Sequence, residues 1–423
     1  MPAATAVSTR LKLRRPFQKL LFAAVCLAIG VFYFKVIYLD YRAANLINDP
    51  VQLSRAVSLA PASAEYRGRL GRYLFFVQQN IPGAAEQYRR ATELNPRAAS
   101  AWLDLALAHK ALAERAQESH ALQRAVAADP RSPRVAWEAA QRYLALGETE
   151  TALRHLQVVV GHDPPASSAA IDLAWQATHD PELMLRYAIP QTVDGRLAFL
   201  NYMVEQQQPA GAALAWNQLV NLKRRFSPGL ALGYVEFLLT SKTPNAEAVG
   251  EVWRILQSLD PEFPALSGTN SIVNGGFEQP SINAGLDWRS DAVNGVNAAI
   301  HVRDAHSGSR SLAIVLAGAP LDDVGVFQYL ALRPGTRYEF YAYVRNETLA
   351  GAGGLRFTIR DAQSNAAYYT SAQLPERDDW QLLRGSFQTP KDAGVAVLRL
   401  VRSPAGQRFR GKFWIDDLEL IEK

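Results

Sequence analysis

The chain closes with the stretch "GKFWIDDLELIEK" (411–423), in which apolar and charged residues alternate. Successive side chains of a strand point to opposite faces, so this pattern predicts a half-buried strand. On a regular strand Trp414, Asp416, Leu418 and Leu420 share one face, and three of the four favour a core. An unpaired buried carboxylate costs on the order of several kcal/mol. We therefore expect Asp416 to have a partner, which depends on the domain that this strand closes.

Short alternating runs of the same kind fill the last third of the chain, each bounded by Gly, Pro, Asn or Asp. They follow a segment rich in turn residues, 263–271, which we interpret as a linker. Eight strands are expected, at 298–304, 311–317, 324–332, 336–346, 354–361, 380–389, 395–403 and 412–420. This succession predicts an antiparallel β-sandwich over 272–423.

Six segments of this region occur in the order typical of one family: "IVNGGFEQP" (272–280), "LDWRS" (286–290), "HSGSRSLAI" (306–314), "VFQYLALRPGTRYEFYAYVR" (326–345), "WQLLRGSFQTP" (380–390) and "GKFWIDDLEL" (411–420). As an ordered set they resemble the jelly roll of carbohydrate-binding modules of the galactose-binding-like type, over about 270–423. The resemblance implies glycan binding by this domain.

The resemblance also implies a structural calcium ion between the chain ends, with Asp416 as one ligand and Glu278 as a second. Calcium takes oxygen ligands from carboxylates and backbone carbonyls, so it would compensate a buried charge. The alternative is that Asp416 accepts hydrogen bonds from backbone N–H groups or pairs with an arginine such as Arg310.

Two strands of this domain carry polar faces suited to sugars. Tyrosine rings stack on sugar rings, and arginines bind carboxylate or phosphate groups through two hydrogen bonds, so such a face would suit an acidic glycan. The candidate glycan-binding residues are Tyr341, Tyr343, Arg356 and Arg360. The alternative is an ordinary solvated face with aromatic cross-strand pairs.

The middle of the chain repeats. The segments "RAVSLAP", "RATELNP", "RAVAADP" and "VVVGHDP" end at prolines spaced by 35, 34 and 34 residues. A fixed period of this length indicates a stacked solenoid. The small, aromatic and terminal-proline positions resemble the tetratricopeptide repeat, most closely over about 62–164, with Glu118 as a departure at a small-residue position. Helical periodicity continues, so we expect one array of helix pairs over 45–262, which would bind a protein partner and carry no chemistry itself.

The N-terminus predicts a membrane anchor. A basic tail (1–19) precedes the apolar run 20–39, which at about 1.5 Å per residue covers about 30 Å, the thickness of a bilayer's hydrocarbon core. The excess of basic residues before the run predicts a cytoplasmic N-terminus, with the bulk of the chain exported across a bacterial-type inner membrane. A cleaved signal peptide and a buried soluble helix are the alternatives.

Catalytic motifs are missing from the sequence: it has no P-loop, no G-x-S-x-G and no H-E-x-x-H. The net charge of +5 is small, and basic residues concentrate in the tail, so we expect no nucleic-acid binding. We therefore expect a non-catalytic, single-pass membrane protein that acts in assembly or export of an envelope glycan of exopolysaccharide or O-antigen type. The alternative is a protein-only assembly scaffold whose jelly roll binds no sugar.

Overall fold

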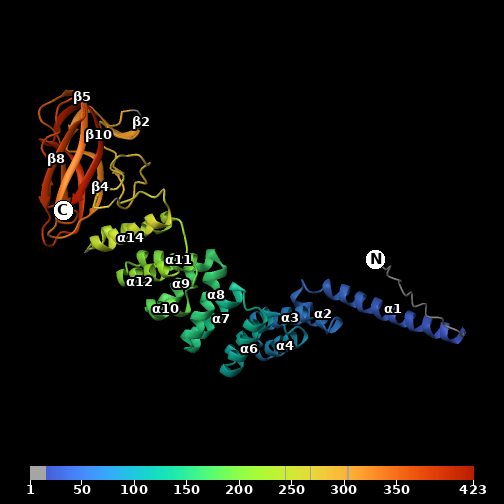
Figure 1. Cartoon of the computed structure of the whole chain (residues 1–423). Helices are drawn as coiled ribbons and strands as arrows, with labels where there is room; N and C mark the ends of the chain where they lie inside the picture. The colour runs from blue at the N-terminus through green and yellow to red at the C-terminus, as the bar shows by residue number, and fades with distance from the viewer. Residues whose placement is uncertain (1–15, 243, 267, 303) are drawn as a thin grey trace, which may run out of the picture. The chain divides into compact units, whose positions relative to one another are not determined.

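The structure, a computed structural model, describes residues 16–242, 244–266, 268–302 and 304–423. The chain forms two compact units that divide between Pro190 and Gln191. The division falls inside the predicted helical array, so the last four helices belong to the same unit as the strands. Figure 1 shows the order of the elements along the chain.

The first unit begins with helix α1 (Pro16–Ala44), whose apolar side chains are largely exposed. In the part of the chain that the structure describes, α1 is the one helix long and apolar enough to span a membrane, although a signal sequence has the same length and composition. Its C-terminal end is attached to the rest of the unit, because Ala43 is buried in a cluster with Ala56 of α2 (Leu53–Leu59) and Tyr66 of α3 (Ala64–Phe76). The short helix η1 (Pro50–Gln52) connects α1 to α2.

Three helix pairs follow at the predicted repeat positions. They are α3 (Ala64–Phe76) with α4 (Ile81–Leu94), α5 (Ala99–Ala111) with α6 (Arg115–Ala128), and α7 (Pro133–Leu146) with α8 (Thr149–His162). Helices α9 (Pro164–Thr178) and α10 (Pro181–Tyr187) complete the unit. The tetratricopeptide-like succession predicted from the proline spacing is confirmed.

Small residues allow the paired helices to approach each other. In the first pair, a Cβ on Gly71 would lie 2.6 Å from the ring of Tyr88, which is fully buried between α3 and α4. The departure at Glu118 is accommodated by a charge partner, since this buried carboxylate lies 3.9 Å from a guanidinium nitrogen of Arg142 in the next repeat. A buried carboxylate without such a partner would be costly.

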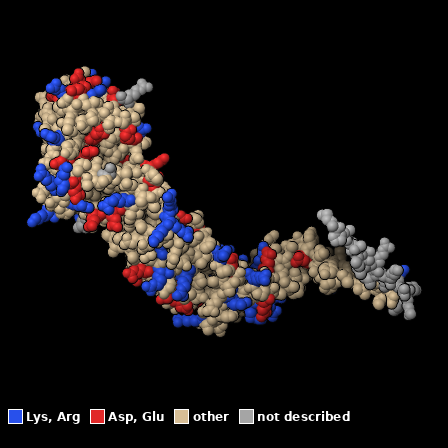
Figure 2. Space-filling model, in the orientation of Figure 1, with Lys and Arg blue, Asp and Glu red and all other residues tan. Residues whose placement is uncertain are grey.

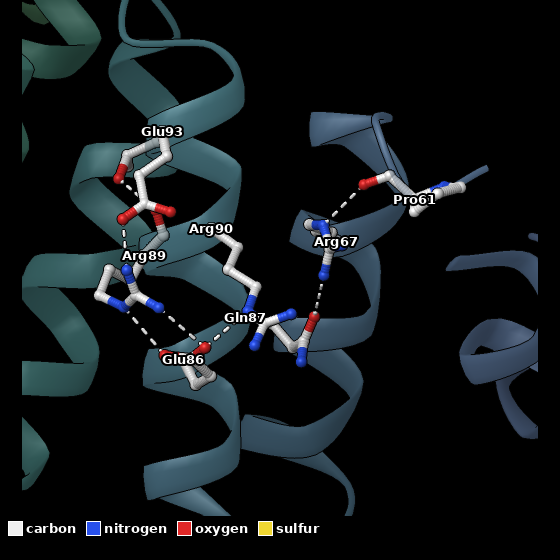
Figure 3. Close-up of polar contacts among 8 residues, drawn as sticks. Pro61, Arg67, Glu86, Gln87, Arg89, Arg90 and Glu93 are labelled. Carbon is white, nitrogen blue, oxygen red and sulfur yellow. Dashed lines mark hydrogen bonds and ion pairs between the residues drawn. The ribbon is translucent and has the colours of Figure 1, made fainter. Parts of the chain in front are cut away.

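Polar contacts add to the packing of the first pair (Figure 3). Arg67 of α3 donates to the side-chain carbonyl of Gln87 in α4 across 3.2 Å. On α4, hydrogen bonds from Arg89 and then Arg90 lower the pKa of Glu86 to about 2. These ion pairs are exposed, so they contribute little to stability. Acidic and basic side chains both occur over the visible face of the helices (Figure 2).

The second unit begins with four α-helices, α11 (Val193–Glu205), α12 (Pro209–Asn221), α13 (Leu232–Thr240) and α14 (Ala246–Leu259), with η2 (Pro228–Ala231) before α13. Ten strands follow: β1 (Arg289–Ser290), β2 (Val296–Val302), β3 (Arg310–Leu321), β4 (Asp323–Ala331), β5 (Arg337–Ala350), β6 (Gly354–Asp361), β7 (Ala367–Thr370), β8 (Gln381–Gln388), β9 (Val395–Ser403) and β10 (Gln407–Glu422). They form two five-stranded antiparallel sheets, ordered β2-β3-β10-β5-β8 and β1-β4-β9-β6-β7.

The predicted β-sandwich is therefore confirmed, with all eight expected strands present and the short β1 and β7 in addition. The core lies between the sheets, as alternation predicts: Phe340 and Val344 of β5 face Phe357 and Ile359 of β6 in one buried cluster. The residues that alternate with these core positions point outward from both sheets.

A β-bulge interrupts β10 beside β5. Asp416 pairs with Tyr343, but Glu419 pairs with Tyr341, so two residues of β10 stand opposite one residue of β5. Asp417, in the bulge, has a φ of 47°, a left-handed conformation that is uncommon for a residue with a side chain.

The extra residue reverses the alternation of β10. Ile415 before the bulge and Leu418 and Leu420 after it all lie in the core. Trp414 and Asp416 lie on the outer face of the sheet. The prediction that Trp414, Asp416, Leu418 and Leu420 share one face is therefore wrong, because it assumed a regular strand.

Candidate functional site

The predicted glycan-binding residues lie on two different sheets. Tyr341 and Tyr343 belong to β5, and Arg356 and Arg360 belong to β6. Each pair points outward from its own sheet, so the structure places the two pairs on opposite sides of the sandwich. The four residues do not form one surface.

The tyrosine side is occupied by contacts within the protein. The ring of His306 stacks on Tyr343 with centroids 3.5 Å apart, and Trp380 meets His306 edge-on at 5.8 Å. The Tyr341 hydroxyl donates to Glu339. The turn that carries His306 therefore covers the Tyr343 ring, and glycan binding at Tyr341 and Tyr343 stays a prediction.

The arginine side carries additional aromatic residues. The strand register places Phe327 of β4, Arg399 of β9 and Thr358 of β6 in one row across the sheet. The Arg399 guanidinium carbon lies 4.2 Å from the Phe327 ring centroid, and a nitrogen of the same group lies 3.3 Å from Asp323. A guanidinium over an aromatic face is attracted by the ring quadrupole.

A second row runs beside the first. Tyr329, Val397 and Arg360 pair across β4, β9 and β6. Arg289 of β1 lies over the Tyr329 ring, at 4.8 Å from its centroid. Arg356 extends the face beyond the first row and donates to the backbone carbonyl of Ser371 across 3.0 Å, which leaves other N–H groups for a ligand.

We name this face the arginine surface and define it by Arg289, Phe327, Tyr329, Arg356, Arg360 and Arg399. It combines flat rings with guanidinium groups, and the carboxylate of Asp323 pairs with Arg399. Phe327 and Tyr329 were missed in the sequence. The alternation in "VGVFQYLAL" (324–332) was the signal that could have identified them, because it places both opposite the core-facing Val326.

The carboxylate of Asp416 is fully buried under the turn that follows β2. Its Oδ2 accepts from the backbone N–H groups of His306 at 2.7 Å and Ser307 at 3.2 Å, and its Oδ1 accepts from the N–H of Asp417 at 2.8 Å. Burial raises the pKa of Asp416, and the three N–H donors act in the opposite direction. This is the backbone alternative expected from the sequence.

Glu278 binds the same turn from the other side. Its Oε1 accepts from the backbone N–H groups of Ser309 at 2.7 Å and Arg310 at 2.9 Å, and Ser309 Oγ donates to its Oε2 at 2.8 Å. These bonds, the Ser309 N–H first, lower the pKa of Glu278. Arg310 thus donates through its backbone N–H, and its charge also lowers the pKa of Glu278.

The donor chemistry of this region suits calcium only in part. A Cβ on Gly276 would lie 3.9 Å from Asp416 Oδ1 and 4.0 Å from Glu278 Cγ, so the two carboxylates border one loop. Oxygen donors of this kind are those that calcium prefers. However, both carboxylates already accept N–H groups, and no cluster of three potential metal-ligating side chains occurs in the described ranges. Calcium binding stays a prediction.

A groove of about 1480 Å³ lies between α14 and one end of the sandwich. Both basic residues, such as Arg254 and Arg333, and acidic residues, such as Glu251 and Asp392, line it. None of the residues predicted from the sequence belongs to it. Its mixed charge does not indicate a particular ligand.

Two known families match the chain, one in the strand region and one in the helical repeats. Residues 269–405 match the family described as carbohydrate binding domain, and residues 73–112 match the family described as TPR repeat. Both are binding-type domains. No curated protein matches the chain.

Solved structures resemble parts of the chain at low identity. A structure described as "CBM4 structure and function" is 18% identical, with a TM-score of 0.30, and covers 36% of this chain and 100% of its own. The CBM22-1 xylan-binding domain of Xyn10C from Paenibacillus barcinonensis is 18% identical, with a TM-score of 0.24, over 32% of this chain and 85% of its own. The MamA protein is 12% identical, with a TM-score of 0.26, over 46% of this chain and 91% of its own.

Proposed function

We propose that this protein is a non-catalytic, membrane-anchored binding protein that acts in assembly or export of a cell-envelope glycan. The observation that carries the proposal is the arginine surface, because it lies within the region that matches the carbohydrate binding domain. The sandwich would bind the glycan through this surface, and the helical repeats would bind a protein partner.

The composition of the surface favours an acidic glycan. Aromatic rings such as Tyr329 offer stacking area to a sugar ring. Guanidinium groups such as those of Arg356 and Arg360 bind carboxylate, sulfate or phosphate groups in pairs of hydrogen bonds. Asp323 pairs with Arg399 and Glu236 pairs with Arg289, so Arg356 and Arg360 supply the remaining positive charge of the surface.

The rest of the chain supports the placement at a membrane. Helix α1 has the length and composition of a single span. An uncleaved signal anchor would place the N-terminus in the cytoplasm and both folded units outside the inner membrane, and the basic tail before α1 supports this orientation. Tetratricopeptide-like helix pairs stack into surfaces that bind proteins, and this supports docking of an assembly or export component.

Glycan binding is tested with the full-length protein in detergent against polygalacturonate oligosaccharides and xylohexaose as acidic and neutral probes. We expect saturable binding of the acidic probe, and a loss of at least about tenfold in affinity in the Arg356→Ala, Arg360→Ala double variant. The control is Arg384→Ala, which removes an exposed arginine from the opposite sheet.

Two outcomes would contradict the proposal in different ways. Folded wild-type protein that binds no member of a wider glycan array would favour the protein-only scaffold. Equal loss of binding in the Arg384→Ala control would indicate that net charge, rather than the arginine surface, governs binding.

A further inference from the structure

The C-terminal helices of the array contact the arginine surface. In α13, Glu236 Oε1 accepts a hydrogen bond from Arg289 Nη2 at 2.6 Å and another from the backbone N–H of Gly285 at 2.7 Å. Arg289 is the residue that lies over Tyr329. A helix outside the matched carbohydrate-binding region therefore holds one arginine of the surface in place.

The end of helix α13 also contacts the opposite edge of the same sheet. Gln363, in the turn after β6, donates to the backbone carbonyls of Ser241 at 3.1 Å and Lys242 at 2.6 Å, directly after the end of α13. Helix α13 is thus attached both at the β1 edge, through Arg289, and at the turn between β6 and β7. These are the two ends of the row formed by Tyr329, Val397 and Arg360.

Helix α14 packs closely against the segment that connects the helices to the strands. Trp253 of α14 is fully buried, and its indole N–H donates to the carbonyl of Pro264 at 2.9 Å. Gly285 lies against the indole so closely that a Cβ would be 2.1 Å from the ring, and its φ of 59° also favours glycine. The predicted linker between the helices and the strands is therefore part of a packed interface.

The ion pair between Glu236 and Arg289 is partly shielded from water, with the Glu236 side chain 34% exposed. The Arg289 side chain is 16% exposed, and its Nε has no hydrogen-bond partner among the described residues. Without the Glu236 carboxylate, this half-desolvated charge would lose its closest counter-charge and would favour a position nearer to solvent. It would then leave the Tyr329 ring.

We infer that Glu236 is a positioning residue of the glycan site, and that α13 forms one side of that site. This inference rests on the proposed function. It assigns the binding unit to the helices α13 and α14 together with the sandwich, rather than to the sandwich alone. Contact between the helical array and the sandwich would thereby affect glycan affinity.

A double-mutant cycle tests the inference in the full-length protein, with polygalacturonate oligosaccharides as the probe. We expect Glu236→Gln to weaken binding about fivefold to tenfold and Arg289→Lys to weaken it similarly. In the double variant the second substitution should add little, because Glu236 acts through Arg289. Glu251→Gln, an exposed carboxylate of α14, is the matched control and should leave affinity unchanged.

The binding results distinguish a failure of this inference from a failure of the proposed function. No binding by the wild-type protein would refute both. Binding by the wild type with unchanged affinity in Glu236→Gln would refute the inference alone. If Glu236→Gln lowers the melting temperature, Gln363→Ala replaces it as the variant: a reduced affinity at an unchanged melting temperature supports the inference, and an unchanged affinity overturns it.

Discussion

Asp416 lies opposite Tyr343 in the register of β10 and β5, on the outer face of its sheet, and yet its side chain is fully buried. The turn that carries His306 covers this part of the sheet and buries the Asp416 side chain. The backbone N–H of His306 donates to Asp416, and its ring stacks on Tyr343. The carboxylate thus fixes a turn over the sheet.

Substitution of Asp416 by asparagine is expected to destabilise the second unit by about 1–3 kcal/mol. In the wild type, three backbone N–H groups, including that of His306, donate to the two carboxylate oxygens of Asp416. In the variant, one of these oxygens is replaced by an NH₂ group, which cannot accept a hydrogen bond. Denaturant unfolding of the full-length protein measures the change. Glu419→Gln, at an exposed position of the same strand, is the control, and equal stability of the two variants would contradict this role for Asp416.

Substitution of Glu278 by glutamine is expected to have an effect that depends on pH. The folded protein holds the pKa of Glu278 below its ordinary value of 4.5, mainly through the Ser309 N–H. Its carboxylate therefore adds stability above about pH 4.5, and this contribution disappears as the pH falls through the lowered pKa. The side chain is exposed, so the effect should be under about 1 kcal/mol.

Thermal melts of wild type and Glu278→Gln between pH 3 and pH 7 check this prediction. The difference in melting temperature should be largest near pH 7 and should shrink toward pH 3. A difference that stays constant over this range would mean that the charge of Glu278 plays no part and that only its hydrogen-bond geometry does.

The sandwich was predictable because strand alternation is a local property. Phe340 and Phe357 could be assigned to the core from "YEFYAYV" and "LRFTI" alone. The bulge at Asp417 was not predictable in this way, since nothing in "IDDLEL" distinguishes an inserted residue from a regular strand. One extra residue was enough to move Trp414 and Asp416 to the outer face.

The candidate site was only half predictable for a related reason. Alternation identifies which side chains point away from the core, but it does not identify the sheet to which a strand belongs. Tyr343 and Arg356 both point outward, and only the pairing of β5 with β10 and of β6 with β9 separates them. The contact between Glu236 and Arg289 spans 53 positions of the sequence and depends on the packing of α13, which no local pattern encodes.

Calcium should raise the melting temperature of the wild-type protein if the predicted ion binds beside Asp416 and Glu278. Binding to the folded state alone stabilises it in proportion to the logarithm of ligand concentration. The measurement compares melting in excess calcium with melting in a chelator, for the wild type and for Asp416→Asn. We expect the shift in the wild type only, and an absence of any shift would leave the three backbone N–H groups as the sole partners of Asp416.

The anchor prediction can be tested with single cysteines, because the chain has one cysteine, Cys26, which lies within α1. In a Cys26→Ser background, Ser8→Cys places a thiol before α1 and Ala62→Cys places one after it. Because basic residues favour the cytoplasmic side, a membrane-impermeant maleimide should label Ala62→Cys in intact spheroplasts. It should label Ser8→Cys only after the membrane is permeabilised. Labelling of Ser8→Cys before permeabilisation would reverse the topology, and a mature protein that has lost this thiol altogether would identify α1 as a cleaved signal sequence.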